Sequence, residues 1–593
     1  MPGIGRLIFR RVDLCARFGL IAVGIILISL SSPVWAQAIP QPDLGTLQKQ
    51  QRQLKQRQQQ DFRDYLEELK GPGKDKGGIE GIPQPTQPQL PHSDRCFDVH
   101  DITFKGATVL SDSEQSHVAR PFLGQCLTLE KINEIVRAVT NLYVEKGFVT
   151  ARASLPQQDI ADGSLEILVM EGHVEGFDLK GVSEAEQRQL ATAFPGLEGE
   201  LLNLRDLEQG LDQMNRLASN NATMKMEPGQ ERGGSIVAIE NQKSKPWRAS
   251  FGLDNSGYKS TGNRQRTMTL GYDNYLNLNE TYSLTLSQDD HANDLGKGAN
   301  EASGYFSIPY GYWTLTYSGS YSDSLSTITG TSATYRSEST TRTHQVDVDR
   351  VLHRNADGKT TGTLGLKTYS SKSYIDGTEL DSSSYRFTSL SGSLAHTRKL
   401  FGGSLSLEGT YTRGVRMLGA DKDAPFVEKG TARAQFTKAE ADVSYFRAFQ
   451  LAEQNLSYSG SLSAQWSPHT LPSTEQLSLG SESTVRGFKE STTSGDIGGY
   501  IQQEIAWTLP QTGMAKLDEI LGIVQAYGAF DIGAIRKDVK DNEEKGVLSG
   551  WAAGLRTSSG YLVVDLAFAR AIDAPSHVHK RGYETYLSAE LSF

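Results

Sequence analysis

The sequence predicts a closed transmembrane β-barrel in the C-terminal part of the chain, preceded by smaller α/β modules. From residue 247 to 593 apolar and polar residues alternate with a period of two, as where Trp313, Leu315 and Tyr317 alternate with threonine and serine. Mean hydropathy is −0.42, and no segment approaches the roughly 20 apolar residues of a membrane-spanning helix. A soluble sandwich also alternates. However, export of the chain, with Ser, Thr, Asp and Glu on one strand face and apolar residues on the other, favours the barrel.

The N-terminus resembles a secretory signal, residues 1–36. A basic start is followed by an apolar run at 18–30, and Val34-Trp35-Ala36 ends in a small residue suitable for cleavage. The apolar run is too short to span a bilayer as a helix, although an uncleaved anchor remains an alternative. We expect the mature chain to begin at Gln37.

Residues 37–70 are rich in glutamine, lysine, arginine and leucine, and they predict a helix that is polar nearly all round. Such a helix suits a water-filled lumen, where it would plug the pore, or else it stays partly disordered. Residues 71–94 repeat glycine and proline, which predicts an extended linker that lets the helix move independently.

Two successive β-α-α-β-β units are predicted between the linker and the barrel. The first, 95–173, has strand-like segments at 97–104, 148–155 and 165–170 and a helical pattern at 129–146 that ends at Gly147. The second, 174–242, is more degenerate. We expect its strands and helices at the following positions: strands at 174–179, 223–227 and 235–240, helices at 184–193 and 204–217.

Two cysteines, Cys96 and Cys126, remain once the signal is removed. In an oxidising compartment a disulfide is the simplest prediction, with reduced structural cysteines as the alternative. Neither has a partner at C-x-x-C spacing, so a metal site is not expected. His577 and His579 fall in a predicted turn, not in a metal-binding cluster.

Composition and motifs exclude several functions. The net charge of −10 argues against a nucleic-acid partner. The sequence has no Walker A segment, no H-E-x-x-H and no G-x-S-x-G elbow, so we expect neither an enzyme nor a cofactor. Energy for any transport must then come from elsewhere.

The most informative segment is Leu471-Pro-Ser-Thr-Glu-Gln, followed by Val485-Arg-Gly-Phe488 and Ser494-Gly-Asp496. From the tetrapeptide alone, Arg486 is most simply a solvated surface residue. The whole segment resembles the signature loop of the two-partner secretion transporters, the haemolysin-activator and filamentous-haemagglutinin exporter type. The 97–106 and 143–150 segments resemble the first polypeptide-transport-associated (POTRA) domain of this family. Asp254-Asn255-x-Gly257 with Arg264 is similar to its first barrel hairpin, although an ordinary Asn/Gly turn explains these residues equally well.

The resemblance implies about 16 antiparallel strands over 243–593, two POTRA domains, and a signature loop near 480–496 that folds back into the barrel. In this arrangement Val485, Arg486, Gly487 and Phe488 lie inside, and Arg486 pairs with Asp531. The wall segment around that aspartate is Gly528-Ala-Phe530-Asp-Ile-Gly533, whose glycines are expected to leave room on the luminal side. Glu504 and Arg556 are further candidate luminal charges.

The function implied is an outer-membrane transporter with POTRA domains in the periplasm. It would bind one unfolded secreted exoprotein, such as a haemolysin or adhesin, and pass it through the barrel, driven by folding outside. Phe593, a terminal phenylalanine in a strand, indicates that the chain is delivered to the outer-membrane assembly machinery. The barrel would then be in contact with outer-membrane lipid. The alternatives are a barrel-assembly factor of the same superfamily and a passive porin.

Overall fold

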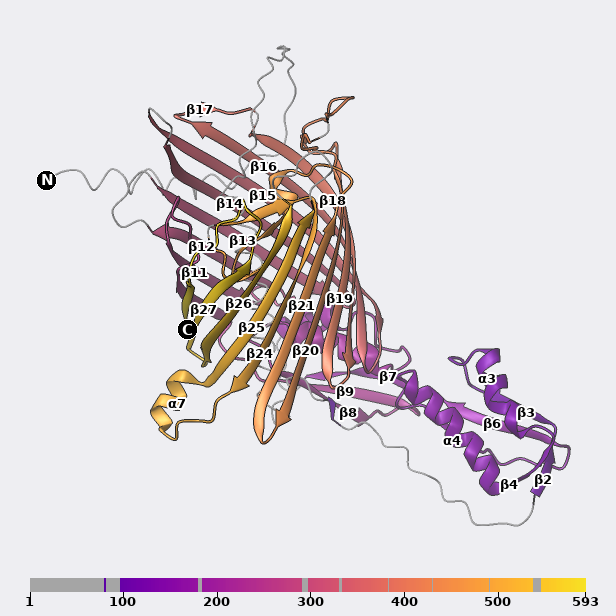
Figure 1. Ribbon diagram of the computed structural model, residues 1–593. Coiled ribbons are helices and arrows are strands. Elements are labelled where there is room, and N and C mark those ends of the chain that lie inside the picture. The colour runs from indigo at the N-terminus through magenta and orange to yellow at the C-terminus, as the bar shows by residue number, and fades with distance from the viewer. Residues whose placement is uncertain are drawn as a thin grey trace. The chain divides into compact units, whose positions relative to one another are not determined.

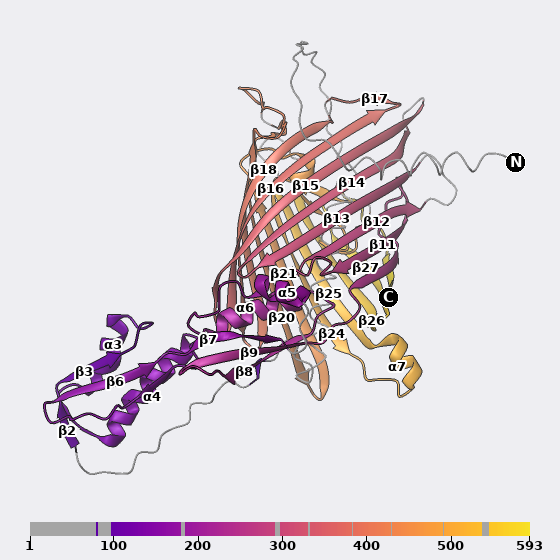
Figure 2. The ribbon, with the colours of Figure 1, turned by 180° about the vertical axis from the view of Figure 1, so that it is seen from behind.

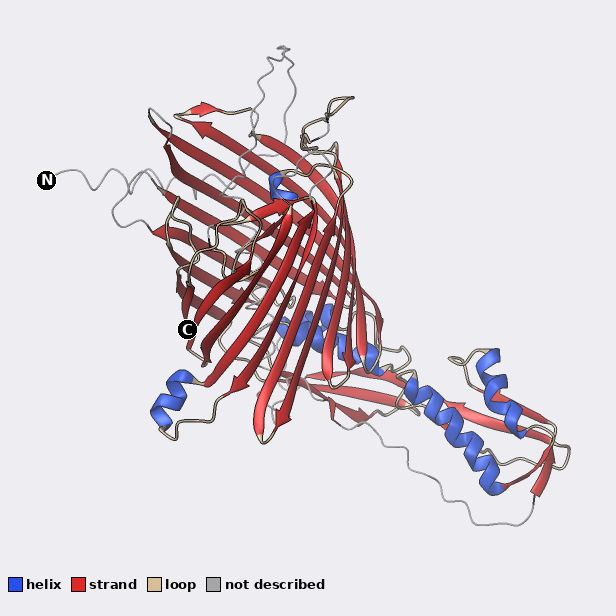
Figure 3. Ribbon diagram, in the orientation of Figure 1, coloured by secondary structure: helices blue, strands red, loops and turns tan. Residues whose placement is uncertain are grey.

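Strands make up most of the described chain in the computed structural model (Figure 3). The structure describes residues 79–80, 96–179, 184–290, 297–329, 333–381, 383–428, 430–489, 491–536 and 545–593. The predicted signal peptide, the predicted helix at 37–70 and the linker apart from residues 79–80 lie outside them. Over these described ranges, no helix is both long enough and apolar enough to cross a membrane.

The first α/β unit combines a three-stranded sheet with a strand pair and two helices. Its elements are β2 (Cys96–Val99), β3 (Asp101–Lys105), α3 (Asp112–Ala119), β4 (Gln125–Thr128), α4 (Leu129–Glu145), β5 (Arg152–Ser154) and β6 (Ser164–Met170). The sheet order is β3-β6-β5, and β2 pairs with β4. Helix α4 begins at the Thr128 cap and buries Ile132, Ile135, Val139 and Tyr143, as its spacing predicts.

Two sequence-based expectations for this unit were wrong in detail. The strand expected at 97–104 is interrupted at His100, which separates β2 from β3. The strand expected at 148–155 is only β5, because the chain turns after Gly147, whose φ is +95°, and continues through bonded turns to Ala151. Cys96 and Cys126 form the predicted disulfide between β2 and β4.

The second unit forms a four-stranded sheet with two helices. Its elements are β7 (His173–Leu179), α5 (Glu184–Ala193), α6 (Leu204–Asn215), β8 (Ala222–Pro228) and β9 (Gly234–Asn241). The sheet order is β1-β8-β9-β7, in which β1 (Ile79–Glu80) comes from the linker and runs parallel to β8. The predicted elements therefore all occur, and a linker segment adds the fourth strand.

Sixteen long antiparallel strands close into a barrel through pairing of β10 with β28 (Figure 1). A short β17 (Thr378–Glu379) extends one hairpin. The barrel strands are β10 (Trp247–Asp254), β11 (Arg264–Asp273), β12 (Thr281–Asp290), β13 (Gly298–Tyr310), β14 (Trp313–Thr329), β15 (Thr334–Arg354), β16 (Gly358–Ile375), β18 (Tyr385–Leu400), β19 (Gly403–Val415), β20 (Thr437–Leu451), β21 (Gln454–Trp466), β24 (Ile497–Thr508), β25 (Ile523–Arg536), β26 (Gly546–Ser558), β27 (Leu562–Asp573) and β28 (Glu584–Ser592).

The predicted alternation sets the two faces of the wall. Trp313, Leu315 and Tyr317 are exposed on the outer face of β14. On β25 the buried residues are Gln525, Tyr527, Asp531 and others of odd number, which face inward, whereas even-numbered residues such as Ile532 point outward. Because closure pairs every strand on both sides, no sheet edge is left open to lipid.

We predict that replacing both Cys96 and Cys126 by serine lowers the free energy of unfolding of the first α/β unit by about 2–4 kcal/mol, because the bond closes a loop in the unfolded chain. The two cysteines are 30 positions apart. Native-state hydrogen exchange of α4 amides in the full chain measures the change, and reduction of the unsubstituted protein should reproduce it. Unaltered protection in both cases would show that the bond is not stabilising.

Candidate functional site

The segment between β21 and β24 folds against the inner face of the barrel wall. It contains a short 3-10 turn at Ser473–Glu475 and a strand pair, β22 (Leu477–Leu479) with β23 (Thr493–Gly495). Val485 and Phe488 are fully buried, in one apolar cluster with Tyr500, Ile535 and Leu548 of the wall. The signature loop, residues 480–496, is thus held by packing as well as by polar contacts.

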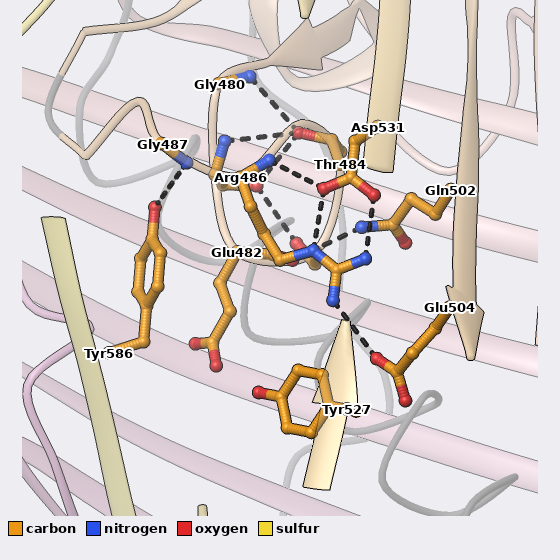
Figure 4. A network of polar contacts seen from close by, with 12 residues as sticks. Gly480, Glu482, Thr484, Arg486, Gly487, Gln502, Glu504, Tyr527, Asp531 and Tyr586 are labelled. Atoms are coloured by element: carbon orange, nitrogen blue, oxygen red, sulfur yellow. Dashed lines mark hydrogen bonds and ion pairs between the residues drawn. The ribbon is translucent and has the colours of Figure 1, made fainter. Parts of the chain in front are cut away.

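Arg486 and Asp531 form a bidentate ion pair at the tip of the loop (Figure 4). Arg486 Nε donates to Asp531 Oδ2 at 2.6 Å, and Nη2 donates to Oδ1 at 2.7 Å. The Arg486 backbone N–H donates to Oδ2 as well, at 3.0 Å. Asp531 is fully buried and Arg486 is 8% exposed. Two parallel hydrogen bonds fix the orientation of the guanidinium as well as its distance.

The charged network continues along the inner wall from this pair. Arg486 Nη1 lies 3.2 Å from Glu504 Oε2, and the other oxygen of Glu504 lies 2.8 Å from Arg556 Nη2. Arg556 stacks over the Tyr527 ring at 4.1 Å, and the Tyr527 hydroxyl donates to Asp565 at 2.8 Å. Glu504 and Arg556, the two further candidates, are therefore parts of one network with Arg486.

Two glycines allow the backbone of the loop to touch the wall. A Cβ at Gly487 would lie 2.6 Å from backbone atoms of β27, and φ there is +96°. On the wall side, a Cβ at Gly550 of β26 would lie 2.0 Å from the Arg486 carbonyl oxygen. The Gly487 N–H donates to the Tyr586 hydroxyl of β28 at 3.2 Å. A side chain at either glycine would push the loop off the wall.

The loop also reaches the seam where β10 meets β28. The Asn255 side chain, just after β10, donates to the Thr585 carbonyl at 2.9 Å and accepts from the Leu587 N–H at 3.0 Å. Lys489 of the loop donates to the Asn255 carbonyl oxygen. Asn255 therefore extends the β10–β28 pairing beyond its last register pair, and the loop is bonded to the residue that does so.

The other members of the predicted hairpin motif are structural. The Asp254 carboxylate accepts from the Ser256 N–H at 2.8 Å. A Cβ at Gly257 would collide with the Gly262 carbonyl oxygen at 1.9 Å. Arg264 is an exposed residue at the start of β11. Phe593 is exposed at the end of the chain, where its N–H donates to the Ala249 carbonyl oxygen. Among the described residues, no cluster of His, Cys, Asp or Glu could hold a metal ion.

The expectation for the wall segment around Asp531 was partly wrong. Gly533 does face inward, where a Cβ would approach Leu479 of β22 to 2.8 Å and Val485 of the loop to 3.0 Å. Gly528 and Phe530 instead point outward, and Phe530 is 43% exposed on the outer face. The reason is that successive side chains of a strand point to opposite faces. Residues 528 and 530 therefore lie on the face opposite to Asp531.

Sequence reasoning missed a second anchor at the loop stem, which comprises residues 471–479. Glu475 is buried, and its two oxygens lie 2.6 Å from Lys367 Nζ of β16 and 2.8 Å from Lys438 Nζ of β20. Asp496 closes the base of the loop by accepting from the Leu471 N–H at 2.9 Å and from the Gln476 side chain at 3.0 Å. The motif that contains Glu475 was recognised from the sequence. The two lysines that bind Glu475 lie on strands far away in the sequence, and no sequence pattern links them to it.

Comparison with known proteins agrees with this geometry. The family model for haemolysin secretion/activation proteins ShlB/FhaC/HecB matches residues 233–557. A ShlB-type POTRA model matches 97–172, and a second POTRA model matches 173–228.

Relatives match over most of their length. The outer membrane transporter CdiB of Escherichia coli is 35% identical over 95% of this chain and 92% of its own. The hemolysin transporter protein ShlB of Serratia marcescens is 30% identical over 83% of each chain. The solved structure of CdiB from Escherichia coli superposes with a TM-score of 0.83 at 34% identity, covering 94% of this chain and 100% of that one. The buried Arg486 loop, the closed barrel and these matches together show that the chain belongs to the ShlB/FhaC/HecB family of two-partner secretion transporters, which lie in the bacterial outer membrane with POTRA domains in the periplasm.

Proposed function

We propose that this transporter passes an unfolded partner exoprotein through its barrel, and that the signature loop controls the conduit by its attachment to the wall. The observation that carries the proposal is the buried Arg486–Asp531 pair, which fixes the loop tip on β25. An exported polypeptide needs room that a loop packed on the inner wall takes up. Export therefore requires the loop to be held in a defined position or to move between defined positions.

The strength of the tip anchor follows from its burial. Removing one partner of a buried, hydrogen-bonded ion pair typically costs about 3–5 kcal/mol, because the remaining charge is stranded away from water. Asp531 is fully buried, and Gln502, opposite it in the strand register, carries no charge that could replace the arginine. If Arg486 is lost, the facing residue of strand β24 therefore offers Asp531 no substitute cation.

The stem anchor is of a different kind. Glu475 binds two lysines that belong to two different strands, β16 and β20. Loss of either lysine leaves the carboxylate with the other, so this anchor tolerates partial opening. In our proposal the stem stays fixed on one side of the lumen, and the tip is the part of the loop that is attached or released as a unit.

We propose that the exoprotein is bound in the periplasm by strand addition to the POTRA sheets. An exposed sheet edge can hold an extended peptide through main-chain hydrogen bonds, with side-chain pockets for selectivity. The β8 edge takes up an extended segment of the linker, because Ile79 pairs with Met224 and Glu80 with Lys225. In this proposal an exoprotein segment replaces β1 on β8 and frees the linker, together with the predicted plug helix that precedes it.

The alternative of a passive porin is disfavoured by the POTRA domains. A passive diffusion pore needs neither POTRA domain, whereas this chain has two, at 97–172 and 173–228. In this proposal the outer-membrane assembly machinery recognises the terminal Phe593 and inserts the barrel into the membrane.

We predict that Arg486→Ala gives a folded barrel that exports its exoprotein at least about tenfold less than the unsubstituted transporter. A loss of about 3–5 kcal/mol would shift an attached–released equilibrium of the loop by roughly two powers of ten or more. Asp531→Ala should behave similarly. Export is measured as exoprotein in the medium, and heat-modifiable migration on gels reports the folded barrel.

The matched control is Arg447→Ala, because Arg447 is an exposed arginine of β20. It should export normally. Full export by a well-folded Arg486→Ala protein would refute the role of the ion pair.

We also predict that a disulfide between Glu80→Cys and Lys225→Cys, which lie opposite each other in the β1–β8 register, blocks export until it is reduced. The lock would keep β1 on the edge that the exoprotein needs. Each single-cysteine variant serves as a control, and so does the unsubstituted protein under the same reductant, because reduction also opens Cys96–Cys126. Undiminished export by the oxidised double variant would exclude the β8 edge as the binding site.

A further inference from the structure

A short helix, α7 (Ala515–Leu521), lies in the turn between β24 and β25. The strand pairings place this turn at the POTRA end of the barrel, where β10 begins directly after the second α/β unit. Phe593 pairs beside Ala249 at that end, Leu562 of β27 pairs with Leu591, and Ile523 of β25 pairs with Ser558 of β26. Both Figure 1 and Figure 2 show α7 beyond the ends of β24 and β25.

Helix α7 has one apolar side, and that side is exposed. At about 100° per residue, Leu517, Ile520 and Leu521 fall on one side, whereas Glu519 falls on the opposite side. Met514, the N-cap residue, is 66% exposed and Ile520 is 56% exposed. In a helix bathed only by water this side would be an unfavourable place for three large apolar residues.

The orientation of the helix is fixed by the segment before it. The Asp518 carboxylate accepts hydrogen bonds from the Thr512 N–H at 2.8 Å, the Thr512 hydroxyl at 2.7 Å and the Gly513 N–H at 3.1 Å. The hydroxyl and N–H of Thr512 hold the pKa of Asp518 below its usual range, so the carboxylate is charged at neutral pH. At the other end, Gly522 forms a bridge with Ser558. The exposed apolar side is therefore held in place.

The helix adjoins a part of the barrel rim that carries exposed aromatic residues. Gly522 adjoins the β26–β27 turn, which carries Tyr561, 69% exposed. The Tyr561 carbonyl accepts from the Ser592 N–H, next to Phe593, 59% exposed. Trp247, with Lys245 over its ring at 4.6 Å, begins β10 on the far side of the seam. Amphipathic aromatic residues at this level are typical of the girdle of a membrane barrel.

We propose that α7 is an interfacial anchor whose apolar side, Leu517, Ile520 and Leu521 together with the N-cap Met514, is inserted among the phospholipids of the periplasmic leaflet. The occupant of this surface is lipid because the helix adjoins the rim whose exposed aromatic residues face the bilayer. Lys516 lies beside the apolar side in the helical register, and basic residues at such positions of interfacial helices commonly extend to lipid phosphates. The anchor fixes the periplasmic ends of β24 and β25, the strands that carry Glu504 and Asp531.

The test uses the transporter without residues 1–36, and hence without Cys15, with a fluorescent nitrobenzoxadiazole label on single introduced cysteines. The native pair Cys96–Cys126 is in a disulfide and is not labelled. Leu517→Cys places the label on the apolar side, and Glu519→Cys is the matched control on the opposite side of the same helix. The proteins are reconstituted into phosphatidylethanolamine–phosphatidylglycerol vesicles with or without doxyl-labelled lipid.

The proposal predicts emission at shorter wavelength for the label at 517 than for the label at 519. The doxyl lipid should remove most of the emission at 517 and little at 519, and aqueous iodide should show the reverse preference. Equal quenching of both labels by iodide would overturn the proposal. A blue-shifted label at 517 that doxyl lipid does not quench, and that returns to longer wavelength when the protein is diluted in the vesicles, would also overturn it, in favour of contact with a second copy.

Discussion

The loop, the inner wall and the seam of the barrel all depend on where the Arg486 guanidinium lies. A guanidinium removed from water must have an anionic partner, and Asp531 supplies one with both oxygens. With Arg486 in this position, its carbonyl oxygen packs against Gly550 and the Gly487 backbone contacts β27. Lys489 then donates a hydrogen bond to the Asn255 carbonyl oxygen. One ion pair thereby sets the position of a segment that touches five strands, β24, β25, β26, β27 and β28, and reaches the end of β10.

The arrangement makes the attachment of the loop cooperative. Glu504 is shared by Arg486 and Arg556, so release of the loop would leave Glu504 with Arg556 and Asp531 without a cation. The apolar contacts of Val485 and Phe488 are lost in the same movement. A loop held in this way is either attached to the wall or detached from it, because few intermediate positions retain part of the binding free energy of these contacts. That property suits a transporter whose conduit must be closed to small molecules and open to a polypeptide.

The sequence predicted the fold well because its strongest signals are local. Alternation over 247–593 predicted a barrel, and the helical spacing of Ile132, Ile135 and Val139 predicted α4. The resemblance of Val485-Arg-Gly-Phe488 to a known motif also led to Asp531. By contrast, the Lys367–Glu475–Lys438 cluster joins segments far apart in the chain, and its existence depends on the curvature and register of the whole barrel. Gly528 and Phe530 were misplaced for a simpler reason, since the motif was treated as a unit although neighbouring residues of a strand face opposite sides.

The central claim is that Arg486 and Asp531 hold the loop through each other. A double-mutant cycle tests it most directly, with Arg486→Ala, Asp531→Ala and the double variant compared by protection of the loop amides from hydrogen exchange in lipid vesicles. The account predicts a coupling energy nearly as large as the effect of either single substitution, about 3–5 kcal/mol, because the double variant should be little worse than either single variant. Additive effects of the two substitutions, with a coupling energy near zero, would contradict it.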